Sequence, residues 1–177
     1  RSAWPAELLD ATGVATESHS WAHVNSDARG SRAIPLPRAR VVGGTSTVNG
    51  CIWLRGSAAD YDEWEARGAQ GWNWNAVLPY FKKVERDMDF DGPWHGKDGR
   101  IPVRRICPDH WCGHAKAVAE AFNAAGYDYI DDQNGEYKDG YFPITISNLY
   151  DRRVSAAIGY LDNGTRRRPN LTISAET

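Results

Sequence analysis

The sequence has little of what marks several common classes of protein. Its formal net charge is -2 at neutral pH, and its basic residues are scattered apart from 166–168, so it has no basic field of the kind that holds nucleic acid. No apolar run approaches the length of a membrane span, and no signal-peptide pattern is visible at the start. We therefore expect neither a nucleic-acid partner nor a membrane span. The residues leave localisation open, with the cytoplasm favoured.

Cysteine is also scarce, because three cysteines in 177 residues argue against a disulfide framework. Cys107 and Cys112 lie close in sequence to His110 and His114, which raises a metal-binding module as an alternative. Zinc ligands, however, usually come as two well-separated pairs, and Pro108 restricts this loop. We expect no metal site here, with the two thiols either free or joined locally to each other.

Aromatic residues, in contrast, are abundant, with eight tryptophans and eight tyrosines. Long segments of the chain show neither helical nor strand periodicity. Aromatic side chains at this density most often fill cores and interfaces. The composition therefore predicts surfaces that are completed by other parts of a larger protein.

The most informative stretch is 40–50, which reads Arg-Val-Val-Gly-Gly-Thr-Ser-Thr-Val-Asn-Gly. Gly43 and Gly44 lack a Cβ, so the backbone can adopt positive φ and approach a flat ring or a pyrophosphate closely. The hydroxyl and amide side chains at 45–49 supply hydrogen-bonding groups at a density that a structural turn does not need. The stretch predicts backbone built for a ligand, although a Gly-Gly pair alone most often marks a simple turn.

Extended to residues 37–56 and 60–64, this stretch resembles the first signature of the glucose-methanol-choline (GMC) family of flavoprotein oxidoreductases. Every fixed position of that signature is met. The similarity covers most of the chain. It continues through Gly71-Trp72, residues 77–82, Glu85, His95-Gly96 and Gly99, and resumes at Arg153, residues 155–157, residues 160–161 and residues 168–172.

Two parts that the family resemblance implies do not occur in these residues. Family members begin with a strand, a GxGxxG turn and a helix that bind the ADP half of FAD, and no GxGxxG is present. They end with a segment that bears a catalytic histidine, which nothing after Leu171 supplies. We therefore expect an internal piece of a larger enzyme. Its partners would be the N-terminal dinucleotide-binding unit and C-terminal catalytic segment of that same enzyme, and a small alcohol substrate.

The resemblance implies an α/β class, here as an α+β fragment of a two-domain FAD-binding oxidoreductase fold. Residues 1–100 would belong to the FAD domain and would include a covering lid and the flavin-contacting loop at 37–56. Residues 101–148 would be a segment of the substrate-binding domain. Residues 149–177 would return to the FAD domain.

The resemblance also assigns roles to residues of the flavin-contacting loop. Residues 40–44 would run past the pyrophosphate and ribityl portion of FAD, and residues 49–52 would line the isoalloxazine near its N5 edge. Some relatives tether the flavin through a histidine at the position of Val48, so FAD is expected to be noncovalent here. A thiol at Cys51 is more simply explained by packing than by nucleophilic attack. The expected cofactor-binding residues are Arg40, Val42, Gly43, Gly44, Ser46, Asn49, Gly50, Cys51 and Ile52.

The implied reaction is oxidation of a primary or secondary alcohol, with hydride passing to flavin N5. A histidine beyond residue 177 would remove the hydroxyl proton, so no residue of this chain is expected to be catalytic. Two alternatives stay open. One is an FAD-containing enzyme of the hydroxynitrile lyase type, and the other is a noncatalytic flavin-binding remnant.

Caps and periodicity predict the secondary structure. Residues 10–37 are expected to form an ordered covering loop, residues 87–99 a turn-rich connector, and His95 a structural hydrogen bond within it. The helix that includes 77–84 is expected to be capped by Asn75. Helices are predicted at 4–9, at 58–67 after a capping-box pair of Ser57 and Asp60, at 113–125 before a C-terminal Gly126, and at 152–162. Strands are predicted at 100–104, where the residues alternate, and at 141–147 and 171–174.

Overall fold

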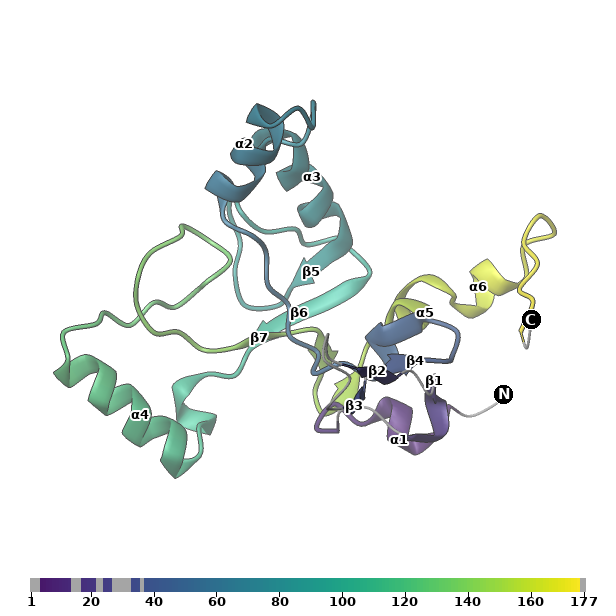
Figure 1. The fold of residues 1–177 in the computed structure, drawn as a ribbon, viewed down its shortest axis with the longest axis horizontal. Helices are drawn as coiled ribbons and strands as arrows, with labels where there is room; N and C mark the ends of the chain where they lie inside the picture. The colour runs from purple at the N-terminus through teal and green to yellow at the C-terminus, as the bar shows by residue number, and fades with distance from the viewer. Residues whose placement is uncertain (1–3, 14–16, 22–23, 27–32, 36, 176–177) are drawn as a thin grey trace. The chain divides into compact units, whose positions relative to one another are not determined.

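The chain forms two compact units in a computed structural model. Unit 1 comprises Arg1–Cys51 and Asn148–Thr177, and unit 2 comprises Ile52–Ser147. Both contain helices and strands, which confirms the mixed fold class that the sequence predicts (Figure 1). The structure describes residues 4–13, 17–21, 24–26, 33–35 and 37–175.

Unit 2 begins with a helix whose start is set by its cap. Helix α2 (Ala58–Ala66) follows Ser57, whose hydroxyl accepts a hydrogen bond from the Asp60 N–H at 3.3 Å. The Asp60 carboxylate accepts one from the Ser57 N–H at 2.9 Å in return. This reciprocal capping box satisfies two N–H groups that a helix start leaves unpaired. The predicted helix at 58–67 is confirmed.

The next helix, α3 (Trp74–Val84), starts two residues earlier than the predicted cap implies. Asn73 has extended backbone, and its side-chain oxygen accepts a hydrogen bond from the Ala76 N–H at 2.9 Å. The predicted cap at Asn75 is wrong, because that residue already lies inside the first turn of α3. Side chains of α2 and α3 meet in an aromatic cluster, in which the Tyr61 ring lies 5.7 Å from those of Trp74 and Phe81.

A three-stranded sheet follows these helices, in the order β5 (Glu85–Asp87), β6 (Ile101–Arg105) and β7 (Thr145–Ile146) (Figure 1). Strand β6 pairs in parallel with β5 and antiparallel with β7. The predicted strand at 100–104 is confirmed within one residue. The predicted strand at 141–147 is too long, because Pro143 lacks the N–H that a strand interior needs.

Helix α4 (Gly113–Ala124) confirms the predicted helix at 113–125. Gly126, at φ +87°, follows its end, which is the left-handed conformation that closes many helices. Strand β7 and α4 are separated in sequence by a long irregular segment, in which Tyr129 and Tyr141 form an isolated bridge.

Unit 1 is built from short elements. Helix α1 (Ala6–Leu9) confirms the predicted N-terminal helix and buries Leu8. The expected covering loop at 10–37 contains short strands where it is described, while residues 14–16, 22–23, 27–32 and 36 lie outside the described part. A short 3-10 helix, η1 (Glu17–His19), precedes β1 (Ser20–Trp21), which pairs with β4 (Arg38–Ala39) just after the loop. Strand β2 (Val24–Ser26) pairs with β3 (Ala33–Pro35).

The predicted helix at 152–162 is wrong in its extent. Strand β9 (Arg152–Arg153) pairs antiparallel with β8 (Asn148–Leu149). Ser155 then caps α5 (Ala156–Tyr160), and Asp162 caps α6 (Asn163–Arg166). Each cap side chain accepts a hydrogen bond from a backbone N–H of the helix that follows it, so α5 and α6 are two separate helices.

The predicted strand at 171–174 is wrong as well, because these residues pair with no other strand of the described part. Among the described residues, no helix has the length and apolar character needed to cross a bilayer.

We predict that Gly96→Ala destabilises the protein by about 3 kcal/mol or more. A Cβ at Gly96 would lie 1.8 Å from the carbonyl oxygen of Lys82, which is backbone of α3 and cannot rotate away. Gly113→Ala is the matched control, because a Cβ there meets no atom within 4 Å. It should stay within about 1 kcal/mol of wild type. Urea unfolding followed by tryptophan fluorescence measures both, and equal midpoints for the two variants would contradict the prediction.

Candidate functional site

Gly43 and Gly44, in the loop at 40–51 of unit 1, have different roles. Both have left-handed backbone, with φ +105° at Gly43 and +61° at Gly44, and the short helix η2 (Gly44–Thr47) starts there. A Cβ on Gly43 would lie 2.8 Å from the Cβ of Ala157, so this glycine lets α5 pack against the loop. A Cβ on Gly44 would meet nothing within 4 Å. The backbone at Gly44 is therefore open to close approach.

Two of the three hydroxyl groups of this loop, those of Ser46 and Thr47, are engaged within unit 1. The Ser46 hydroxyl donates to the Gly43 carbonyl at 2.6 Å and accepts from the Ala156 N–H at 2.9 Å. The Thr47 hydroxyl donates to the Gly44 carbonyl at 2.6 Å, and Thr47 is buried. These side chains, whose density suggested ligand contacts, fix the shape of the loop and join it to the start of α5.

A buried arginine holds the other end of the loop. Nη1 of Arg153 donates to the Asn49 carbonyl at 2.5 Å, to Asn49 Oδ1 at 2.8 Å and to the Ser46 carbonyl at 3.4 Å. Its Nη2 donates to the carbonyls of Gly13 at 2.8 Å and Asp10 at 3.3 Å. Arg153 is 2 % exposed. One guanidinium thus joins the loop to the segment that follows α1.

The strand geometry of β9 explains why this arginine points inward. Successive side chains of a strand alternate between its two faces, and here Arg152 is exposed while Arg153 is buried. Sequence reasoning placed Arg153 among the positions of the family resemblance but gave it no role. The pattern Arg-Arg is a poor signal, because only the fold shows which of the two is buried.

Cys51 ends the loop with unusual backbone for its residue type. Its φ is +59°, and its side chain is 1 % exposed. Burial raises the pKa of the Cys51 thiol, and the positive charge of Arg153 acts in the opposite direction. A thiol with a raised pKa is a poor nucleophile. This agrees with packing as the simplest role for Cys51.

The remaining expected site residues differ in exposure. Arg40 is exposed, with its guanidinium 5.6 Å from the centroid of the Trp21 ring. Val42 is half-buried and Gly50 is exposed. Val48, the position of the covalent tether in some relatives, is 7 % exposed. Ile52 belongs to unit 2, where it is 50 % exposed and bridges to Ile146.

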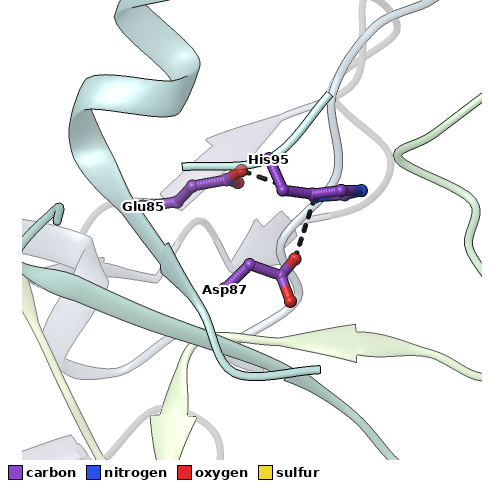
Figure 2. A group of neighbouring side chains, drawn as sticks. All are labelled: Glu85, Asp87 and His95. Carbon is purple, nitrogen blue, oxygen red and sulfur yellow. Dashed lines mark ion pairs between the residues drawn. The ribbon is translucent and has the colours of Figure 1, made fainter. Parts of the chain in front are cut away.

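Unit 2 holds a separate cluster of charged side chains that the sequence did not reveal. Figure 2 shows its centre, where the carboxylates of Glu85 and Asp87 both face the ring of His95. Nδ1 of His95 lies 3.0 Å from Asp87 Oδ2 and 3.6 Å from Glu85 Oε1. Its Nε2 lies 2.8 Å from Asp132 Oδ2. The hydrogen bond expected for His95 within the connector at 87–99 is made instead with Asp132, outside that connector, and His95 is the hub of a larger network.

Two buried arginines complete this network. Arg55 pairs with Glu85, and it also donates to the Trp94 carbonyl at 2.7 Å. Arg105 donates to Asp87 at 2.5 Å and to Asp132 at 2.5 Å. The three cationic side chains, with His95 protonated, therefore face the carboxylates of Glu85, Asp87 and Asp132, and the more exposed carboxylate of Asp89 lies 3.9 Å from Arg105 Nη1.

The carboxylates and His95 shift one another's pKa values. Burial alone lowers the pKa of His95, but hydrogen bonds with Asp132, Asp87 and Glu85 outweigh it and raise the pKa to about 10. Burial alone raises the pKa of Asp87, but hydrogen bonds from His95 and Arg105 hold it well below its usual range. His95 is thus a cation at neutral pH.

Glu85, Asp87 and His95 place potential metal-ligating atoms within 4.8 Å of one another. Arg55 and Arg105, however, already occupy the carboxylates, and a divalent cation would have to displace one of these guanidinium groups. The arrangement is that of a buried ion-pair network, which fixes the geometry of unit 2.

The cysteine and histidine residues at 107–114 form no such cluster among the described residues. Cys107 and Cys112 are exposed, and neither is in a disulfide. Cys112, His110 and His114 instead lie at an apolar cavity of about 500 Å³ between α4 and residues 141–144, which also includes Trp111 and Phe122.

Comparison with known proteins gives a consistent result. The sequence profile described as GMC oxidoreductase matches residues 6–177. Over 141 residues the chain is 48% identical to 5-(hydroxymethyl)furfural oxidase of Methylovorus sp. (strain MP688), covering 79% of this chain and 27% of that protein. Over 144 residues it is 39% identical to oxygen-dependent choline dehydrogenase of Brucella ovis, covering 81% of this chain and 26% of that protein.

Solved structures agree with these sequence matches. Pyridoxine 4-oxidase from Mesorbium loti superposes with a TM-score of 0.87 at 26% identity, covering 98% of this chain and 35% of that one. A formate oxidase superposes with a TM-score of 0.79 at 22% identity, covering 97% of this chain and 31% of that one, and shows the same fold. The chain spans about a quarter of the length of the two relatives and about a third of these structures.

We predict that the network around His95 makes stability depend on pH in two directions. The raised pKa of His95 adds stability that is complete below about pH 6.5, its unfolded value, and is lost as pH rises toward 10. The lowered pKa values of Glu85, Asp87 and Asp132 add stability that is complete above about pH 4.5 and is lost as pH falls further. Urea midpoints measured from pH 4 to 10 should therefore be highest between about pH 4.5 and 6.5.

His95→Gln should remove the decline above pH 6.5 and lower stability at pH 6 by about 3 kcal/mol, because it removes one cation and leaves Glu85, Asp87 and Asp132 facing only the guanidinium groups of Arg55 and Arg105. His114→Gln is the control, since His114 is exposed and should leave the profile unchanged. Parallel profiles for wild type and His95→Gln on the alkaline side would show that His95 is not the group responsible.

Proposed function

Because the chain belongs to the GMC oxidoreductase family, we propose that it is an internal portion of an enzyme that uses FAD to oxidise an alcohol. The match over residues 6–177 carries the proposal, and the oxidases and the dehydrogenase named above support it. The remainder of the same enzyme would supply the dinucleotide-binding unit and the catalytic histidine. The division of this chain into FAD-domain residues 1–100 and 149–177 and substrate-domain residues 101–148 stays a prediction. The two compact units are defined by compactness alone and do not test it.

The loop in unit 1 suits the binding of FAD. Left-handed backbone with open space at Gly44 lets peptide groups approach a pyrophosphate or a flat ring. Arg153 supplies a buried positive charge beside this loop, and its Nε is buried without a hydrogen-bond partner among the described residues. Both features favour an anionic group. The residues we propose to contact FAD are Arg40, Val42, Gly43, Gly44, Ser46, Asn49, Gly50, Cys51 and Ile52.

When bound, FAD supplies the hydride acceptor of the reaction. The part of this chain is to hold and orient that group through backbone N–H donors, which need no side chain between the loop and the ligand. We propose noncovalent attachment, because Val48 has no nucleophilic group and is largely buried.

For the substrate we propose a small alcohol that carries a hydroxymethyl group. The support comes from the name of the relative that is 48% identical, 5-(hydroxymethyl)furfural oxidase, which states such a group. Choline and pyridoxine in the names of the other proteins are likewise small molecules.

We expect the full-length protein to show the blue and near-ultraviolet absorption bands of a flavin. Anaerobic addition of an alcohol substrate should bleach these bands, because hydride transfer removes the oxidised chromophore. A bound flavin that no alcohol bleaches would instead support a lyase or a noncatalytic remnant. A purified protein without any flavin would refute the proposed function.

We also predict that Gly44→Ala reduces the FAD content of the purified protein. The added methyl group would occupy the open space beside the loop, and the left-handed backbone would cost about 1 kcal/mol of stability. Gly71→Ala is the matched control, because Gly71 has φ +81° with nothing within 4 Å of a Cβ, and it belongs to unit 2. Both variants should lose similar stability in thermal unfolding, but only Gly44→Ala should lose flavin. Full flavin content in Gly44→Ala would argue against placing the cofactor at this loop.

A further inference from the structure

We propose that Arg153 is a positioning residue that also sets the electrostatics of the bound flavin. Its guanidinium would hold the flavin-contacting loop in shape, and its positive charge would favour the negative charge that a flavin gains on reduction. The inference rests on the proposed function, because it requires FAD at the loop. It adds a residue that the sequence resemblance left without a role.

The first support is the burial of this charge without a matching carboxylate. The acceptors of Arg153 among the described residues are all uncharged oxygens, namely the carbonyls of Ser46, Asn49, Asp10 and Gly13 and the side-chain oxygen of Asn49. Within the part of the chain that the structure describes, no carboxylate lies at ion-pair distance from this guanidinium. A buried cation is costly unless an opposite charge compensates it.

Among the described residues of unit 1, the exposed carboxylate of Asp10 interacts electrostatically with Arg153. Hydrogen bonds from Thr12 are the main cause of the lowered pKa of Asp10, and the charge of Arg153 contributes less. Asp10 is exposed, and Thr12 donates to its carboxylate from both N–H and hydroxyl at 2.7 Å. Water screens an exposed carboxylate, so it compensates the buried guanidinium only weakly. A negative charge on a bound ligand would complete the site.

The second support is that the charge acts on the residues proposed to meet the flavin. Asn49 accepts from Arg153 through both its carbonyl and its side chain. The charge of Arg153 also acts on the Cys51 thiol. Arg153 therefore lies directly behind the stretch from Asn49 to Cys51, where any ligand at this loop would feel its field.

The contacts of Asn49 allow the electrostatic role of Arg153 to be tested separately from its role in holding the loop in shape. Asn49 Oδ1 accepts from Arg153 Nη1 at 2.8 Å and from the Cys51 N–H at 3.1 Å. Since both partners donate, an aspartate at this position can accept the same two hydrogen bonds. Asn49→Asp thus preserves the bracing but neutralises the guanidinium. Arg153→Lys does the reverse, because an ammonium keeps the charge but lacks the planar fork that reaches both segments.

The test compares these variants in the full-length, FAD-loaded protein by the two-electron midpoint potential of the flavin, flavin release and thermal unfolding. Asn49→Asp should weaken the preference for reduced over oxidised flavin at least tenfold, a fall of about 30 mV or more, with unfolding temperature unchanged. Arg153→Lys should keep the wild-type potential but release flavin faster and unfold at a lower temperature. Asn170→Asp adds the same charge at an exposed position of unit 1 and should match wild type throughout.

Each outcome decides a different part of the inference. A wild-type potential in Asn49→Asp would overturn the electrostatic role, even if Arg153→Lys fails to fold. Wild-type flavin release and unfolding in Arg153→Lys would overturn the positioning role. A wild-type protein purified without flavin would refute the proposed function itself, which is a distinct result, because the inference then has no ligand on which to act.

Discussion

The buried guanidinium of Arg153 is the interaction on which unit 1 depends. Arg153 lies 140 positions from Gly13 and 104 positions from Asn49 in the chain, and it binds Gly13 through one nitrogen and Asn49 through the other. The loop between Gly43 and Cys51 has few apolar side chains to hold it, so these hydrogen bonds and the close packing of Gly43 on α5 define its shape. The open backbone at Gly44 follows from that shape, and the proposed flavin contacts depend on it.

Unit 2 also has few buried apolar side chains, and buried ion pairs fix its geometry. The side chains of Glu85, Asp87 and Arg105 are buried together with Val103. Buried ion pairs stabilise a fold less than their Coulomb energy suggests, but they tolerate little change in geometry. The network around His95 therefore specifies how β5, β6 and the segment at Asp132 fit together. Exposed aromatic side chains such as Trp64 and Trp72 are consistent with the proposal that other parts of a larger enzyme cover this chain.

Local signals in the sequence predicted the local features of the fold. The capping box at Ser57, the alternation before Arg105 and the glycine after α4 each act within a few residues, so α2, β6 and α4 were predicted correctly. Features that depend on contacts between residues far apart in the sequence were not predicted correctly. Nothing near Arg153 in sequence shows that its acceptors lie at Asn49 and Gly13, and periodicity alone merged β9 and α5 into one helix. The site residues were carried over from the family resemblance, and their contact with FAD stays a prediction.

The central claim is that the backbone at 40–52 lies against FAD, with Arg153 behind it. A crystal structure of the full-length, FAD-loaded protein tests this most directly. In that structure we expect the flavin and pyrophosphate to contact peptide groups of this loop, with the cofactor occupying the open space at Gly44. An FAD held by other segments, with the Gly43-Gly44 turn exposed to solvent, would contradict it.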